Sequence, residues 1–188
     1  ASGRQIDLHM AVIPAVSRSP QPDPLFILVG GPGESATYSY PTIASAFERI
    51  NQRRDIILVD QRGTGKSNPL NCPVSVEDDY STEFDPVEQS EYAQECLDSL
   101  DADPRYYTTS IAMDDLDDVR RGLGYERINL YGISYGSRAA LVYLRQHPQH
   151  VRAVILDGVA PPNWVLGPSA PADAQQAVEL ILERCSSD

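Results

Sequence analysis

A serine between two glycines gives the clearest chemical signal in the sequence. Residues 128–136 read INLYGISYG, an apolar run that leads directly into the pattern G-x-S-x-G centred on Ser134. This pattern is typical of a nucleophile elbow, in which a strand turns sharply into a helix and exposes the serine hydroxyl at the edge of a sheet. Gly132 and Gly136 suit positions where a side chain would collide with neighbouring backbone. The motif therefore predicts an activated serine that attacks a carbonyl carbon.

The segments around Ser134 support this interpretation, which matters because so short a pattern also occurs by chance. Residues 137–147 are rich in helix formers and apolar on most faces. Ala139 and Ala140 would let such a helix lie close to a sheet. A short apolar run from Val151 to Asp157 follows. Strand, turn, buried helix and strand together form the context that a nucleophile elbow requires.

A glycine-rich loop predicts the second half of the site. Residues 25–29 form a continuous apolar run that indicates a buried strand, and Gly30-Gly31-Pro32-Gly33 follows it directly. In such a site a backbone N–H from this loop joins the N–H of the residue after the nucleophile. We therefore expect Gly31 and Tyr135 to form an oxyanion hole, with Gly30 as the second choice in the loop.

The same loop also fits a dinucleotide-binding oxidoreductase. Residues 31–36 (GPGESA) match G-x-G-x-x-G/A after a strand, and Asp60 ends the next strand, near the expected place of a ribose-binding acid. Two observations argue against this alternative. Pro32 removes an N–H from the phosphate cradle, and the G-x-S-x-G motif would be left without a role.

Apolar strands alternate with helices along the chain, which predicts a mostly parallel sheet covered by helices on both faces. Proline and glycine breaks from position 161 separate a core at 1–160 from a segment at 161–188. The acidic residues of the helix expected at 111–123 are interpreted as a solvated face rather than as a metal site; they are Asp114, Asp115, Asp117 and Asp118. We expect strands at 6–16, 25–29, 55–60, before Ser134 and at 151–157, and helices at 41–51, 86–100, 111–123, 137–147 and 172–185.

Composition excludes several classes of partner. The 188 residues carry a net charge of −12, and a surface this acidic repels nucleic acid and anionic membranes. No apolar run approaches the ~20 residues that a membrane helix needs. The three cysteines, Cys72, Cys96 and Cys185, fit no zinc pattern. Cys72 and Cys96 could pair in an oxidising compartment or remain two reduced buried thiols.

The base that a serine nucleophile needs is missing from the sequence. His147 and His150 follow the predicted helix at its far end, and His9 lies on the first, edge strand, so none is a credible base. In this type of site the chain order is serine, then acid, then histidine. Asp157 ends the strand after the elbow and is a weak choice for the acid. We therefore expect the chain to contain half a catalytic site.

Three blocks of sequence resemble one enzyme family: GGPGESA at 30–36, DQRGTGKSNP at 60–69, and the run from YGISYGSRAALVYLRQHP to VRAVILDGVAPP at 131–162. They are similar to the prolyl aminopeptidase and tripeptidyl aminopeptidase branch of the α/β-hydrolases. The resemblance implies an α/β-hydrolase fold, truncated here before its last strands. It also implies removal of residues or short peptides from a peptide with a free N-terminus, without metal or cofactor. Ser134 would be the nucleophile, and Tyr135 and Gly31 the oxyanion donors.

Further expectations follow from this resemblance. Many prolyl aminopeptidases have His where this chain has Val29, which favours the tripeptidyl relatives. The catalytic Asp and His, and the acidic residues that bind the substrate's amino group, would lie beyond position 188, in the C-terminal half of the enzyme. Residues 161–188 would begin the cap. Cysteines spaced like Cys72 and Cys96 suggest a disulfide and a periplasmic or secreted location, with a cytoplasmic one as the alternative. A non-catalytic chain completed by a second polypeptide is the competing hypothesis.

Overall fold

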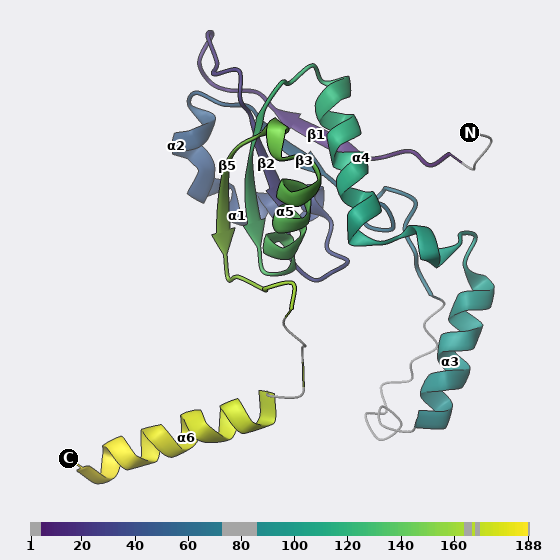
Figure 1. Ribbon diagram of the computed structural model, residues 1–188, viewed down its shortest axis with the longest axis vertical. Coiled ribbons are helices and arrows are strands. Elements are labelled where there is room, and N and C mark those ends of the chain that lie inside the picture. The colour runs from purple at the N-terminus through teal and green to yellow at the C-terminus, as the bar shows by residue number, and fades with distance from the viewer. Residues whose placement is uncertain (1–4, 73–85, 164–166, 168–169, 188) are drawn as a thin grey trace.

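Five strands form one sheet at the centre of the molecule (Figure 1). The computed structural model describes residues 5–72, 86–163, 167 and 170–187. The sheet order is β1-β3-β2-β4-β5, with β1 antiparallel to β3 and the other neighbours parallel. This mostly parallel sheet confirms the predicted class. The strands are β1 (Met10–Ile13), β2 (Leu25–Leu28), β3 (Ile56–Val59), β4 (Ile128–Ile133) and β5 (Val151–Asp157).

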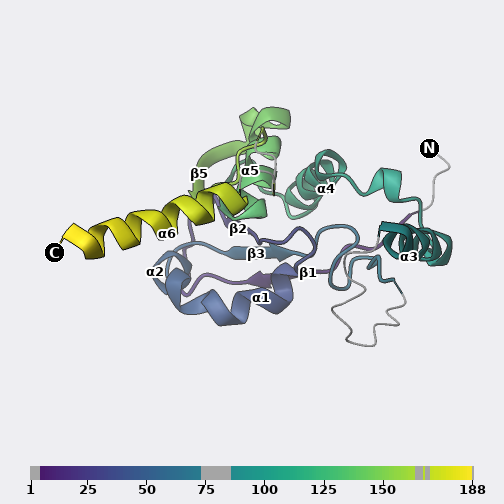
Figure 2. The same cartoon turned by 90° about the horizontal axis from the view of Figure 1, so that it is seen from below.

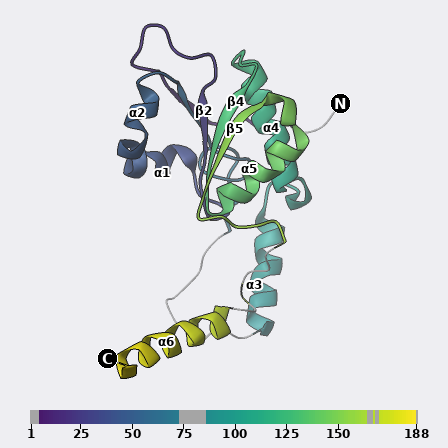
Figure 3. The same ribbon diagram turned by 60° about the vertical axis from the view of Figure 1, so that its left-hand side comes forward.

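Helices cover both faces of the sheet. Figures 2 and 3 show α1 and α2 on one face and α4 and α5 on the other, whereas α3 and α6 project away from these layers. The helices are α1 (Ala36–Ile43), α2 (Glu48–Asn51), α3 (Pro86–Ser99), α4 (Thr109–Gly122), α5 (Tyr135–Gln146) and α6 (Ala170–Ser187), with short 3-10 turns η1 (Ala44–Phe47), η2 (Pro104–Tyr106) and η3 (Pro148–His150).

The central strands are buried on both sides, and alternate residues enter two different cores. On β2, Phe26 and Leu28 face the core beneath α4 and α5. Leu25 and Ile27 face the other core, beneath α1, with Tyr40. Continuous apolar runs in sequence are therefore the expected signature of these strands.

Strand register brings the two predicted halves of the site to the same edge of the sheet. Leu25 pairs with Asn129 and Leu28 with Gly132 on the parallel strands β2 and β4. The loop that begins at Gly30 and the turn at Ser134 therefore leave adjacent strands side by side. Loops after the carboxyl ends of parallel strands are where open α/β sheets bind their ligands.

Several sequence predictions differ from the structure. The strand expected at 6–16 is confined to Met10–Ile13. The helix expected at 41–51 is divided into α1, η1 and α2, and it begins earlier, at Ala36. The Ser35 hydroxyl caps α1 by accepting a hydrogen bond from Tyr38 N, and Pro41 lies inside this helix. The acidic face of α4 is not all solvated. Asp117 is buried, and Asp115 forms a two-bond ion pair with Arg62. Helical spacing alone did not show which of these carboxylates face inward.

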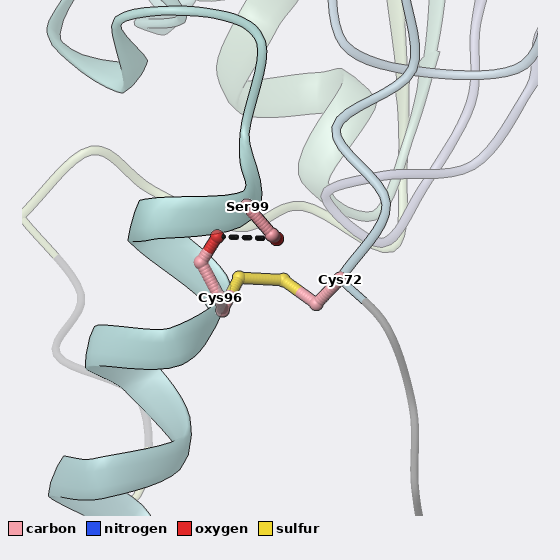
Figure 4. Close-up of a disulfide and its surroundings, with 3 residues drawn as sticks. All are labelled: Cys72, Cys96 and Ser99. Carbon is pink, nitrogen blue, oxygen red and sulfur yellow. Dashed lines mark hydrogen bonds between the residues drawn. A yellow bond between two sulfur atoms is a disulfide. The ribbon is translucent and has the colours of Figure 1, made fainter.

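A disulfide joins Cys72 to Cys96 on α3 (Figure 4). Their Cα atoms are 4.9 Å apart, and Ser99 Oγ donates a hydrogen bond to the Cys96 carbonyl one turn later. Residues 73–85, between Cys72 and α3, lie outside the described residues. Among the helices that the structure describes, none is both long and apolar enough to cross a membrane.

Candidate active site

Ser134 occupies a strained turn between β4 and α5. Its φ of 53° and ψ of −120° lie in a region that L-residues with a side chain rarely adopt. The strand ends at Ile133 and the helix begins at Tyr135, so Ser134 alone makes the turn. Its side chain is exposed at the sheet edge. The structure thus places Ser134 as a nucleophile elbow requires.

The two glycines of the motif are needed because the helix lies against the strands. A Cβ on Gly136 would collide with the carbonyl of Leu28 and lie 2.8 Å from Val29 O, both on β2 or at its end. A Cβ on Gly132 would collide with Gly136 O and lie 2.8 Å from Ser137 Cα. These contacts are with backbone, which cannot rotate away. The glycines therefore fix how closely α5 approaches the sheet beneath Ser134.

Hydrogen bonds hold the elbow to the end of β5. Ser134 N donates to Asp157 O at 2.8 Å. Ser137 Oγ donates to Ser134 O at 2.6 Å and accepts from Ala160 N at 2.8 Å. Ser137 is fully buried. The Asp157 carboxylate accepts a hydrogen bond from Tyr131 instead of facing a histidine. Ser134 is thus positioned by β5 as well as by its own strand.

The glycine-rich loop lies beside Ser134. A Cβ built on Gly30 would be 3.4 Å from Ser134 Cβ, so a side chain at position 30 would reach the elbow. Gly31 has a φ of 98°, where glycine is favoured, and precedes a cis peptide bond to Pro32. Tyr135 is the first residue of α5, and its N–H therefore has no partner within the helix. Of the two residues predicted to supply oxyanion donors, Tyr135 directly follows Ser134, and Gly31 follows Gly30 in the loop beside it.

Asp60 anchors the start of α1, the segment that follows the glycine-rich loop. This fully buried carboxylate accepts hydrogen bonds from Ser35 Oγ at 2.8 Å, from Thr37 N at 3.0 Å and from Lys66 N at 3.2 Å. Burial alone raises the pKa of Asp60, but these hydrogen bonds outweigh it and lower the pKa below its usual value. Asp60 is fully engaged inside the protein, so it is not free to bind a ribose. This finding argues against the dinucleotide-binding alternative.

A pocket of about 500 Å³ opens beside the elbow. The glycine-rich loop and Tyr135 form one side, and the segment Tyr107–Thr109 forms another. Tyr135 and Thr109 share a hydrogen bond of 2.8 Å between their hydroxyl groups. Arg62 also lines the pocket; it is held by Asp115 and by a hydrogen bond of 2.9 Å to Tyr106 O. Sequence reasoning missed these pocket residues because only tertiary packing brings them to the elbow.

No histidine lies near the nucleophile, although all three fall within the described residues. His147 and His150 follow α5, whose 12 residues separate them from Ser134 by about 18 Å. His9 precedes β1, three strand positions from β4, which corresponds to about 14 Å. Its Nδ1 lies 3.1 Å from Asp60 Oδ2. In the part of the chain that the structure describes, no three His, Cys, Asp or Glu side chains are grouped to hold a metal ion.

The chain belongs to the α/β-hydrolase fold family, whose pattern matches residues 23–182. A tripeptidyl aminopeptidase of Streptomyces coelicolor is 30% identical over 177 residues, which cover 86% of this chain and 33% of that protein. The serine protease Hip1 of Mycobacterium tuberculosis is 32% identical over 155 residues, or 74% of this chain and 30% of that protein. The chain therefore spans about a third of the length of these relatives. Their names confirm the resemblance to peptidases of this fold.

Solved structures agree with this assignment. A proline iminopeptidase-related protein of Thermus thermophilus superposes with a TM-score of 0.52 and 25% identity, over 81% of this chain and 40% of that one. The proline iminopeptidase of Mycobacterium smegmatis has a TM-score of 0.53 at 21% identity, which shows the shared fold. Together the elbow, the family and these relatives support a hydrolase.

Proposed function

We propose that this chain carries the nucleophile of a serine peptidase that removes residues or short peptides from the free N-terminus of a peptide. The observation that carries the proposal is the strained backbone of Ser134 between β4 and α5, enforced by the packing of Gly132 and Gly136. The aminopeptidase names of the relatives support the choice of substrate.

In the proposed mechanism, Ser134 Oγ attacks the carbonyl carbon of the scissile amide while a base takes its proton. The carbonyl electrons move to oxygen, and the N–H groups of Gly31 and Tyr135 stabilise the resulting oxyanion. Removal of one such donor typically lowers kcat by about 10²–10³. Collapse of this intermediate breaks the C–N bond and returns the proton to the leaving amine. Water then hydrolyses the acyl-enzyme. The step needs no metal or cofactor.

We further propose that the catalytic Asp and His are supplied by sequence beyond position 188. Two observations support this. The three histidines of the chain are remote from Ser134, as described above. In addition, β5 pairs only with β4 among the described strands, and Ile155 on β5 is 46% exposed. A seven-residue strand with an open edge and an exposed apolar side chain is suited to accept further strands.

We also propose that residues 161–188 begin a cap over the site. The support is that apolar side chains on α6, including Leu180, Ile181 and Leu182, are more than half exposed, as expected for a helix that packs against further chain.

The location of the enzyme is a separate part of the proposal. The Cys72–Cys96 disulfide favours an oxidising compartment, and hence a periplasmic or secreted enzyme.

Labelling with a fluorophosphonate probe tests the proposal. In the full-length protein, Ser134 should react rapidly, and Ser134→Ala should abolish labelling. The isolated 188-residue chain should react slowly because the base is missing. Equally fast labelling of the isolated chain would place a base inside it and refute the proposed division of the site. Failure of the full-length protein to cleave any peptide with a free N-terminus would refute the substrate assignment.

A further inference from the structure

The turn within the glycine-rich loop brings an acidic side chain back towards Ser134. Gly31 and Gly33 have φ values of 98° and 113°, and between them the chain reverses. As a result, Glu34 Oε2 lies 3.6 Å from the position of a Cβ built on Gly30, and Ser134 Cβ lies 3.4 Å from the same point. These two distances place the Glu34 carboxylate at most 7.0 Å from Ser134 Cβ.

Glu34 carries the uncompensated charge of the pocket beside Ser134. Among the residues that line this pocket, only Glu34 and Arg62 are charged. The Arg62 guanidinium is neutralised by two hydrogen bonds to Asp115, at 2.6 and 2.5 Å, and these bonds raise the pKa of Arg62. Glu34 forms no ion pair with any residue in the described ranges, and its side chain is exposed. The pocket therefore presents a net negative charge to whatever binds there.

We propose that Glu34 binds a positively charged ammonium group of the substrate and is a specificity-determining residue of this site. The inference depends on the proposed function, because a peptide with a free N-terminus carries such a group. Glu34 would bind this group together with the acidic residues expected beyond position 188. An ammonium hydrogen-bonds a carboxylate at about 2.8 Å. The bound cation therefore lies within about 10 Å of Ser134 Cβ. An extended residue spans about 3.3–3.6 Å, so an N-terminal ammonium held by Glu34 lies no more than about three residues from the scissile bond.

A lysine side chain near the scissile bond offers the same chemistry as the N-terminal ammonium, so the experiment must separate them. The test compares three chromogenic anilides in the full-length protein: Ala-Ala-Ala with a free N-terminus, its N-acetyl form, and N-acetyl-Ala-Ala-Lys. We expect Glu34→Gln to lower kcat/KM about tenfold or more for the substrates whose cation it binds, since a charge-assisted hydrogen bond is lost. Cleavage of the neutral N-acetyl-Ala-Ala-Ala anilide should change less than twofold.

The pattern across substrates identifies the source of the cation. If Glu34→Gln lowers kcat/KM only for the substrate with a free N-terminus, Glu34 binds the N-terminal ammonium. If it lowers kcat/KM only for the lysine substrate, Glu34 binds a basic side chain. Glu34→Asp, which keeps the charge on a shorter side chain, should retain part of the preference. Glu48→Gln makes the same charge change at an exposed position on α2 and should alter none of the three rates.

Three outcomes would overturn the inference. If Glu34→Gln lowers all three rates equally, the residue has only a structural role. If it changes none, the carboxylate does not contact the substrate. Both results leave the proposed peptidase function standing, because the wild type still cleaves peptides. If the wild type cleaves none of the substrates, the proposed function fails and the inference fails with it.

Discussion

Acid should remove a defined part of the stability of this protein through Asp117. This carboxylate joins α4 to α5, the helix that begins after Ser134. It accepts hydrogen bonds from Arg120 Nε at 2.7 Å and from Tyr143 OH at 2.8 Å. Burial alone raises the pKa of Asp117, but hydrogen bonds from Arg120 and Tyr143 and the charge of Arg120 outweigh it and lower the pKa to about 2. Its unfolded value is 3.8.

The sign and size of the effect follow from this difference. Because the folded pKa is lower, the native state favours the ionised form, and the resulting stabilisation is complete above the unfolded pKa. It is lost as the pH falls from about 4 towards 2. A shift of this size corresponds to about 2 kcal/mol. Asp117→Asn removes the titrating group, so the difference in unfolding free energy between wild type and variant should shrink by about 2 kcal/mol between pH 5 and pH 2.

Urea unfolding of both proteins at several pH values measures this difference. Other carboxylates titrate in both proteins and cancel in the comparison. Part of the cost should persist at all pH values because the variant leaves Arg120 buried without its partner. Asp118→Asn is the matched control. Its ion pair with Arg121 on the same helix is exposed, so a change below about 0.5 kcal/mol is expected. If the difference in unfolding free energy between wild type and Asp117→Asn stays constant with pH, the reasoning is refuted.

Three further predictions concern the elbow, the disulfide and the start of α1. Gly136→Ala forces a Cβ into the backbone of β2, so it should destabilise the protein by about 1–3 kcal/mol and suppress Ser134 labelling. Gly122→Ala is the control, because no atom lies within 4 Å of the new Cβ, and it should have neither effect. Replacing Cys72 and Cys96 by Ser opens a loop with a sequence separation of 24 and should lower the unfolding free energy by up to about 3–4 kcal/mol. The measurement compares this variant with wild type, with and without reductant. An unchanged unfolding free energy would mean that the disulfide hardly restricts the unfolded chain. Asp60→Asn should lower the melting temperature and slow probe labelling together, because the start of α1, which follows the glycine-rich loop, loses its anchor. Normal labelling in a destabilised variant would separate the two roles.

The elbow and the strands were predictable because their signals are local in sequence. In each of these segments the local residues determine the local backbone conformation. The segments are G-x-S-x-G, the apolar runs at 25–29 and 55–60, and the glycine-rich loop. The start of the first helix was also encoded, in the capping residue Ser35, although the prediction placed it at position 41. By contrast, the burial of Asp117 and the pairing of Asp115 with Arg62 depend on which face of α4 meets the rest of the protein.

The pocket was beyond sequence reasoning for a similar reason. Tyr107 and Thr109 carry no motif, and their place beside the elbow depends on the path of the chain between α3 and α4. Glu34 had a usable signal, since it directly follows Gly33, the last residue of the glycine-rich loop. Its meaning became clear only when the left-handed glycines showed that the turn carries its carboxylate back towards Ser134.

The adjacency of β2 and β4 has a consequence for how the chain folds. Asn129 Nδ2 donates a hydrogen bond to Asp23 O, and these residues are 106 positions apart. During synthesis the glycine-rich loop is complete long before the strand that carries Ser134 emerges. Until then, the apolar residues of β2 can pair with β3 but lack β4, their neighbour on the other side. Such non-local pairing slows folding and leaves one edge of an apolar strand open to misassociation until β4 emerges.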